Sequence, residues 1–353
     1  MQEPKEVLNI FGKYTPLVDK EIKSLLSEQN NLLMYDMMRY FFGYLDENLS
    51  EVSSFGGKRF RPGICLLLAD FYGVCDKAVE IASSIEIFHN FTLIHDDIED
   101  RDLLRRGRPT VWNKWGINHG INTGDAQLIL VSLEFDRFAK KNPEISSKVH
   151  ELVNKKYLTI AEGQFLDFHL SELSIDNSEV NEESNFDLMG RKSGVLVGLP
   201  AQVAGIVAGK SEEECQDLWN YGYNLGLAYQ LSDDLVSIWG SAQNSGKSEL
   251  ADIREKKKTL PIIHLYEVGN DEARKTLKLL YDKLEDLTES EVAEVKGLLD
   301  QGDAYEYVWG KVQACLRTVE DCIDKLSITE EQKTLLRNIN SALIVDVRKE
   351  AKC

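Results

Sequence analysis

The sequence predicts an all-α protein, and three of its features lead to that prediction. Only seven prolines interrupt 353 residues, so long helices are possible. Runs in which β-branched residues alternate with polar ones are few. Three segments, 60–73, 77–97 and 214–234, exceed the length of a strand and repeat apolar residues at spacings of three and four. We expect roughly ten or more helices in a single domain that spans residues 1–353.

Other segments predict a core helix, two loops and a loose end. The segment 194–209 carries no charge, but it is shorter than the ~20 residues of a membrane-spanning helix and contains a proline. We therefore expect a buried core helix there and no transmembrane segment. Polar stretches at 171–183 and 240–249 predict loops, and the closing segment 346–353 is expected to fray.

Composition excludes some classes of partner. The chain has 59 acidic and 41 basic side chains, a net charge of −18, which disfavours general binding to nucleic acid or to anionic membranes. An anionic small molecule is not excluded, because a local pocket can oppose the overall charge. Six scattered cysteines lack metal-ligand spacing and predict reduced thiols. Together with an N-terminus unlike a signal peptide, they predict a cytoplasmic protein.

A cluster of acids follows an apolar stretch at 95–100. Asp96 and Asp100 are four residues apart, so on a helix they lie ~40° apart on one face. Like charges at this spacing destabilise a helix, and a divalent cation would relieve the repulsion. Mg²⁺ suits carboxylate oxygens and keeps sites open for phosphate. The alternative is a solvated acidic helix end.

A second acidic pair, Asp233 and Asp234, also follows an apolar helical stretch, and Gln230 precedes it by one turn. Two such clusters, each at the end of a helix, can face each other across a helical bundle. Gln164 and Asp167 share a helix face and could contribute to the same site. Each element alone is commonplace, but together they predict a metal site that holds several ions.

Basic residues lie where an anion could bind. Clustered cations at a predicted helix start, Lys58, Arg59 and Arg61, follow two glycines. Arg105 and Arg106 come soon after the first acidic cluster, although a solvated turn is the simpler interpretation of that pair. Further candidates are Lys192, Lys247 and Lys257, with Asp252 nearby in sequence, whereas Lys256 and Lys258 are expected at the surface.

These motifs occur in a characteristic order. GGKRFRP, HDDIED, RRGRPT, EGQFLD, RKSG, YQLSDD and DIREKKKTLP follow one another between residues 55 and 262. In this the chain resembles the trans-isoprenyl diphosphate synthases of the polyprenyl synthetase family. The resemblance implies the isoprenoid synthase fold, a single large helical bundle around a deep central cavity, and a homodimer. It also implies three Mg²⁺ ions and head-to-tail condensation of isopentenyl diphosphate with an allylic diphosphate in isoprenoid biosynthesis.

The resemblance implies a role for each matching residue. The metal ligands would be Asp96, Asp100 and Asp233, with Asp234 assisting. The allylic diphosphate would be held by Arg105, Lys192 and Lys247, helped by Gln230 and Lys257. Isopentenyl diphosphate would be held by Lys58, Arg61, His89 and Arg106. Ser193 and Gln164 would steady the allylic chain. The residues expected to carry catalysis are Asp96, Asp100, Arg105, Lys192, Asp233 and Lys247. His95 is interpreted as a structural residue.

Two positions depart from the family pattern. Ser237 stands where the second acidic motif often has a further Asp, and Lys256 stands where the family often has Gly. The sequence from Asp233 to Ser237 also matches the start of the metal motif of class I terpene cyclases, but Ser241 occupies the position of its final acid. A cyclase on the same fold therefore remains an alternative, as does a non-catalytic subunit of a heteromeric synthase.

Residues just before the first acidic motif predict the length of the product. Phe91 and Thr92 lie five and four residues before Asp96, and Phe88 lies one turn further back. This pattern resembles archaeal geranylgeranyl diphosphate synthases, so we expect a C20 product, with C15 farnesyl diphosphate next. The alternative is that both phenylalanines are simply core residues.

Overall fold

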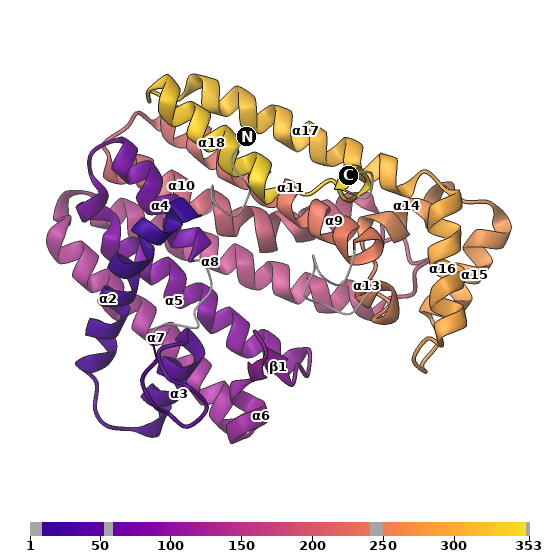
Figure 1. The fold of residues 1–353 in the computed structure, drawn as a ribbon, viewed down its shortest axis with the longest axis horizontal. Coiled ribbons are helices and arrows are strands. Elements are labelled where there is room, and N and C mark those ends of the chain that lie inside the picture. The colour runs from indigo at the N-terminus through magenta and orange to yellow at the C-terminus, as the bar shows by residue number, and fades with distance from the viewer. Residues whose placement is uncertain (1–8, 53–58, 241–249, 351–353) are drawn as a thin grey trace. The chain divides into compact units, whose positions relative to one another are not determined.

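The computed structural model describes residues 9–52, 59–240 and 250–350, and their chain is helical almost throughout (Figure 1). Within the described ranges, the strands are limited to β1 (Leu104–Arg105) and β2 (Arg108–Pro109), which pair as an antiparallel hairpin. The predicted all-α class is confirmed. None of the helices described is long and apolar enough to cross a membrane.

The chain forms two compact units. Of the described residues, the N-terminal unit contains those within 9–153 and 200–215, and the C-terminal unit contains those within 154–199 and 216–350. Three helices run from one unit into the other: α8 (Pro143–Glu172), α10 (Val195–Val207) and α11 (Glu212–Trp239).

The N-terminal unit is built around α5 (Cys75–Glu99), which packs against α2 (Thr15–Ser27), α4 (Phe60–Phe71) and α7 (Ile117–Lys141) (Figure 1). The remaining elements of this unit are η1 (Asn9–Lys13), α3 (Leu33–Phe42) and α6 (Val111–Trp115).

Residues of α5 are buried on nearly every side, as expected of a helix surrounded by others. Gly124 lets α7 approach α5 closely, because a Cβ there would lie 2.3 Å from the ring of His95. His95 therefore packs between two helices, which agrees with its interpretation as a structural residue.

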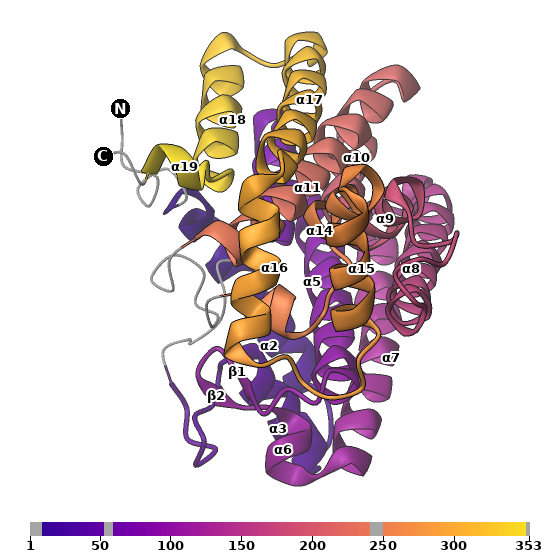
Figure 2. The same ribbon diagram turned by 90° about the vertical axis from the view of Figure 1, so that its right-hand side faces the viewer.

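The C-terminal unit holds a second set of helices: α9 (Glu182–Met189), the π-helical turn η2 (Gly190–Gly194), α13 (Ala251–Arg254), α14 (Leu260–Val268), α15 (Asp271–Tyr281), α16 (Glu289–Gln301), α17 (Ala304–Lys325), α18 (Glu330–Leu343) and α19 (Val347–Glu350). α15 and α16 lie side by side (Figures 1 and 2) and share a core with α14. Polar residues satisfy the first backbone N–H groups of several of these helices. Asn181, Thr288 and Thr329 each form a capping box.

The predicted helical segments are helices in the structure: 60–73 falls on α4, 77–97 within α5, 214–234 within α11, and 194–209 on the largely buried α10. The predicted loop at 171–183 is confirmed in its centre, but α8 ends later and α9 begins earlier than expected. The loop predicted at 240–249 lies, apart from Gly240, outside the described residues.

The prediction of a frayed end is wrong for the first residues of the closing segment. Tyr305 Oη donates to Asp346 at 2.8 Å, and Val347 in α19 is buried. Arg348 forms an ion pair with Glu306 and stacks over the ring of Tyr305. The sequence alone did not reveal this aromatic anchor on α17.

Candidate active site

The first acidic cluster lies at the C-terminal end of α5. Asp96 is half-buried in the last turn, and the backbone N–H of Asp100, the C-cap residue, donates to the carbonyl of Asp96 at 2.8 Å. No basic residue occurs in that last turn, and the negative end of the helix dipole adds to the repulsion between the acids. The fold therefore concentrates negative charge where a cation would be stabilised.

The donor set suits Mg²⁺. Among the described residues there is no group of three or more His, Cys, Asp or Glu side chains that could hold a metal ion. Mg²⁺ is commonly bound through one or two carboxylates, with water and phosphate completing its octahedron. Asp96 and Asp100 fit this pattern, as do Asp233 and Asp234.

The arginine hairpin after α5 reaches back to the same helix end. Arg106 and Gly107 form its two-residue turn, and both have positive φ, as a type I′ turn requires. Nε of Arg105 donates to Oδ1 of Asp97. Burial raises the pKa of Asp97 to about 6, and the charge of Arg105 opposes this rise. A buried carboxylate thus holds Arg105 beside the acids of α5.

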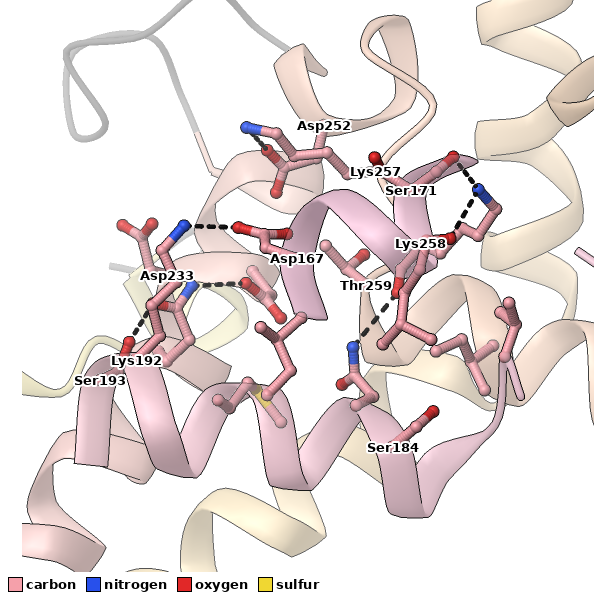
Figure 3. A pocket seen from close by; sticks show the side chains of 18 residues that line it. Asp167, Ser171, Ser184, Lys192, Ser193, Asp233, Asp252, Lys257, Lys258 and Thr259 are labelled. Atoms are coloured by element: carbon pink, nitrogen blue, oxygen red, sulfur yellow. Dashed lines mark hydrogen bonds and ion pairs between the residues drawn. The ribbon is translucent and has the colours of Figure 1, made fainter. Parts of the chain in front are cut away.

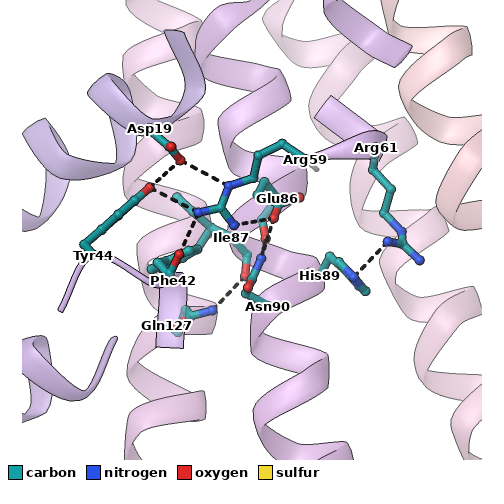
Figure 4. Close-up of polar contacts among 10 residues, drawn as sticks. All are labelled: Asp19, Phe42, Tyr44, Arg59, Arg61, Glu86, Ile87, His89, Asn90 and Gln127. Atoms are coloured by element: carbon teal, nitrogen blue, oxygen red, sulfur yellow. Dashed lines mark hydrogen bonds and ion pairs between the residues drawn. The ribbon is translucent and has the colours of Figure 1, made fainter. Parts of the chain in front are cut away.

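Three of the four residues predicted to hold isopentenyl diphosphate come together in the N-terminal unit. Nη1 of Arg61 lies 2.8 Å from Nε2 of His89 (Figure 4). Burial, followed by the charges of Arg61, Arg106 and Arg105, holds the pKa of His89 well below its usual range. Burial and the positive charge of Arg59 also lower the pKa of Arg106. The site therefore has an excess of positive charge that an anion would balance.

Arg59 does not act as the phosphate-facing cation that the sequence suggested. Its side chain is 1% exposed and is directed at protein atoms from three helices, α2, α3 and α5 (Figure 4). The sequence prediction missed this because clustered basic residues look alike until their partners are known.

The C-terminal unit contains a cavity of about 240 Å³ that collects most of the remaining predicted residues (Figure 3). Its charged lining includes Asp167, Lys192, Asp233, Asp234, Asp252 and Lys257. Lys192 forms an ion pair with Asp167, and Nζ of Lys257 lies 3.8 Å from Oδ1 of Asp252. Asp233 and Asp234 lie within α11, which continues to Trp239, so the prediction that this pair ends its helix is wrong.

A chain of hydrogen bonds fixes Asp234. Ser193 Oγ donates to Oε1 of Gln230 at 2.8 Å, and Nε2 of Gln230 donates to Oδ1 of Asp234 at 3.0 Å. Gly226 makes this approach possible, because a Cβ there would lie 2.6 Å from the carbonyl oxygen of Ser193. Ser193 and Gln230 therefore orient a carboxylate in this structure.

Asp252 is the functional candidate to which the sequence assigned no role. It is 6% exposed and accepts a hydrogen bond from Oγ of Ser237 at 2.5 Å. Ser237 occupies the fifth position of the second acidic motif, so a carboxylate from α13 lies beside the position where the motif lacks one. The signal available in the sequence was Asp252 itself, but its nearness to Ser237 depends on the fold.

Lys256 and Lys258 are not the surface residues that the sequence predicted. Lys256 has φ of +52°, a conformation that glycine adopts without strain, which explains why glycine suits this position. Its Nζ donates to the carbonyl of Glu285 at 2.7 Å. Nζ of Lys258 donates to the carbonyls of Leu170 and Ser171 at the end of α8, and burial lowers its pKa.

The residues predicted to set product length lie on α5. Phe88 is buried, its ring centroid lies 5.6 Å from that of Phe91, and Phe91 contacts the ring of His95 at 4.9 Å. Thr92 Oγ1 donates to the carbonyl of His89 at 2.8 Å. The predicted ligands Lys58 and Lys247, and the cyclase position Ser241, lie outside the described residues.

Carboxylate pairs accompanied by arginines and lysines are the kinds of side chain that suit a diphosphate bound through a metal. Comparison with known proteins gives the family. The Polyprenyl synthetase family model matches residues 43–299, so the chain belongs to that family and is a trans-prenyltransferase of the isoprenyl diphosphate synthase class.

Named relatives agree with this assignment. The chain is 35% identical to the geranylgeranyl pyrophosphate synthase of Geoglobus acetivorans over 264 residues, which cover 74% of this chain and 77% of that protein. It is 29% identical to a (2E,6E)-farnesyl diphosphate synthase of Mycobacterium tuberculosis over 341 residues, 95% of this chain and 92% of that protein. A crystal structure of a geranylgeranyl pyrophosphate synthase superposes with a TM-score of 0.82 at 31% identity and covers 98% of this chain and 99% of that one.

Proposed function

We propose that this protein is a Mg²⁺-dependent synthase that condenses isopentenyl diphosphate head-to-tail with allylic diphosphates to give geranylgeranyl diphosphate (C20), with farnesyl diphosphate (C15) as the next candidate. Relatives of both kinds support this range of products. The observation that carries the proposal is the cationic group around Arg61, His89 and Arg106. A cyclase binds one diphosphate and has no use for a second cationic group of this kind.

Three groups of residues would have separate roles in the reaction. Asp96, Asp100, Asp233 and Asp234 would hold three Mg²⁺ ions, and bound Mg²⁺ would supply positive charge to the leaving diphosphate. Arg105 and Lys192, aided by Gln230, Lys257 and Lys247, would hold the allylic diphosphate and stabilise the charge that develops as its C–O bond breaks. Lys58, Arg61, His89 and Arg106 would orient isopentenyl diphosphate so that its double bond attacks the allylic carbon. The new C–C bond replaces the broken C–O bond, and the adduct then loses a proton to the released diphosphate.

We also propose that residues 1–353 act as one catalytic domain, because the match to the family model, residues 43–299, includes residues of both units. A homodimer is supported by apolar side chains exposed along α7 in the N-terminal unit: Ile117, Ile121, Leu128, Ile129 and Leu133. The five cysteines among the described residues are free thiols, which supports a cytoplasmic location.

A product assay tests the activity. Purified protein is incubated with Mg²⁺, isopentenyl diphosphate and C5, C10 or C15 allylic diphosphates, and the products are identified. The proposal expects elongated diphosphates that require both substrates. Hydrocarbon released without isopentenyl diphosphate would indicate a cyclase instead. Absence of turnover with every allylic starter would favour the non-catalytic subunit.

The metal assignment predicts that Asp96→Ala abolishes turnover, with a loss of at least about a thousandfold, because the leaving diphosphate loses charge stabilisation. Asp76→Ala, at the opposite end of the same helix, is the control and should retain activity. Circular dichroism checks that both variants stay folded. Retained activity in Asp96→Ala would contradict the assignment.

If Phe91 limits the chain length of the product, Phe91→Ala should lengthen the product, because removal of the ring leaves room for further isoprene units. Product chain length is read by chromatography. Phe165→Ala removes a ring that is 68% exposed on α8 and should leave the product unchanged. An unchanged product in Phe91→Ala would return Phe91 to an ordinary packing role.

A further inference from the structure

Arg59 is a buried cation, and each of its three guanidinium nitrogens donates to a protein acceptor. Its Nε lies 3.1 Å from Oδ1 of Asp19, Nη1 lies 2.8 Å from Oε1 of Glu86, and Nη2 lies 2.9 Å from the carbonyl of Phe42. Burial opposes its charge, but Glu86, Tyr44 and Asp19 outweigh that effect and raise the pKa of Arg59. A guanidinium so engaged is not available to bind a diphosphate itself.

The backbone of Arg59 is strained in a way that shapes the start of α4. It is the N-cap residue, with φ 47° and ψ 44°, a left-handed conformation that is unfavourable for a residue with a side chain. Its carbonyl accepts the first helical bond, from the N–H of Gly63 at 2.8 Å. Such strain persists where surrounding contacts hold it, and here the buried ion pairs do so.

Two contacts from the start of α4 meet one turn of α5. Arg59 bonds Glu86, and Arg61, two residues later, bonds His89, three residues after Glu86 (Figure 4). Asn90 closes the group by donating to Oε1 of Glu86 at 2.8 Å. The first pair is a buried salt bridge, so it fixes the register in which the second pair meets.

The contact with Arg61 sets the tautomer of His89. A guanidinium can only donate, so Nε2 of His89 must accept and the proton of the neutral ring lies on Nδ1. Nδ1 is buried and has no hydrogen-bond partner within the part of the chain that the structure describes. Its N–H is therefore a donor left for a ligand, provided that Arg61 stays in place.

We infer that Arg59 is a positioning residue. Its buried ion pairs with Asp19 and Glu86, together called the clamp, hold Arg61 against His89. The contact with Arg61 in turn presents the Nδ1–H of His89 to isopentenyl diphosphate. The final step rests on the proposed function, whereas the clamp and the tautomer do not.

Nitrogen-15 NMR of the histidine rings in the ligand-free protein tests the clamp. The wild-type signals of His89, identified by their loss in His89→Gln, should be those of a ring with its proton fixed on Nδ1. In Arg59→Lys, and in the nearly isosteric Glu86→Gln, the chemical shifts of the two ring nitrogens of His89 should move toward each other, as in a ring that exchanges between its two tautomers. Arg137→Lys alters an arginine that pairs with Glu21 and Glu28, and it should leave His89 unchanged. Folded Arg59→Lys or Glu86→Gln protein with the wild-type His89 signals would overturn the inference.

Steady-state kinetics then separates positioning from a loss of stability. We expect KM for isopentenyl diphosphate to rise about tenfold in Arg59→Lys and Glu86→Gln, the cost of about one hydrogen bond to a charged group, with KM for the allylic substrate unchanged. An equal rise in KM for both substrates would contradict the positioning role, and so would an unchanged KM for isopentenyl diphosphate. If the wild-type protein shows no turnover, the proposed function fails, while the NMR result still decides whether Arg59 fixes His89.

Discussion

Buried carboxyl groups in the N-terminal unit behave differently according to their partners. Glu86 accepts hydrogen bonds from both Arg59 and Asn90. Asp97 is buried to a similar degree, but it has a single arginine partner, and its pKa rises to about 6. Glu134 on α7 is more extreme: burial, and then the nearby charge of Glu21, raise its pKa to about 9. For Asp97 and Glu134, burial is the first cause of the raised pKa, and nearby charges then modify it.

Glu134 makes the stability of the protein depend on pH. Its folded pKa is raised above the usual 4.5, so its stabilising contribution is complete below pH 4.5 and is lost as the pH rises through about 9. We expect the free energy of unfolding to fall between pH 5 and pH 9, by at most about 1.4 kcal/mol per pH unit from this group. Glu134→Gln should flatten that dependence and be more stable than the wild type at pH 8, as measured by urea unfolding.

The control for this prediction is Glu267→Gln, at an exposed glutamate of α14, which should keep the wild-type slope. A Glu134→Gln protein whose unfolding free energy still falls with the wild-type slope would show that Glu134 is ionised in the folded state. Arg137 would then neutralise it more effectively than its 3.4 Å contact suggests.

Among the secondary-structure elements, the approach of α11 to η2 and to the first turn of α10 matters most for the cavity of the C-terminal unit. Gly222 and Gly226 lie one turn apart on α11, and a Cβ at either would meet backbone atoms, the nearest being the carbonyl oxygens of Val197 at 2.4 Å and Ser193 at 2.6 Å. Glycine is normally unfavourable inside a helix by about 0.5–1 kcal/mol. Here its absent side chain is what brings Gln230 within reach of Ser193.

Gly226→Ala should therefore separate the two elements. We expect a loss of about 1–3 kcal/mol in stability, because the backbone of η2 cannot yield as a side chain can. Turnover should also fall, since Gln230 would lose Ser193 and release Asp234. Gly297→Ala is the matched control: this glycine lies inside α16 with no atom within 4 Å of an added Cβ, so the protein should be unchanged or slightly more stable. Equal effects of the two substitutions on stability would contradict this account.

At the scale of the whole molecule, the helices were predictable because long amphipathic or apolar segments have few alternatives in a protein with seven prolines. Motifs supplied the candidate ligands, such as Asp96 and Asp233, and their role as ligands stays a prediction. Arg59, Asp252 and Lys256 were not, because their roles depend on a buried partner, a distant helix or a backbone angle. Pattern identifies residue types at a site, whereas tertiary contacts decide which of them face the ligand.

The proposed homodimer gives a test at this scale. Ile129 and Leu133 are 62% and 41% exposed on neighbouring turns of α7, and burial of this remaining surface against a second copy would contribute about 1.5–3 kcal/mol per chain. The wild-type protein should elute at twice 40.1 kDa in size-exclusion chromatography with light scattering. Ile129→Glu/Leu133→Glu should shift it to the monomer mass, since two carboxylates would be buried without partners.

Leu279→Glu alters a leucine that is 73% exposed on α15 and should keep the dimer mass, so a general effect of surface charge is distinguishable. A double variant that retains the wild-type mass would remove α7 from the interface. If the two chains do associate through α7, then α5, which packs on that helix and carries the first acidic pair, is supported from outside by the second copy. The monomeric variant should then lose thermal stability and activity together, whereas a fully independent chain would lose neither.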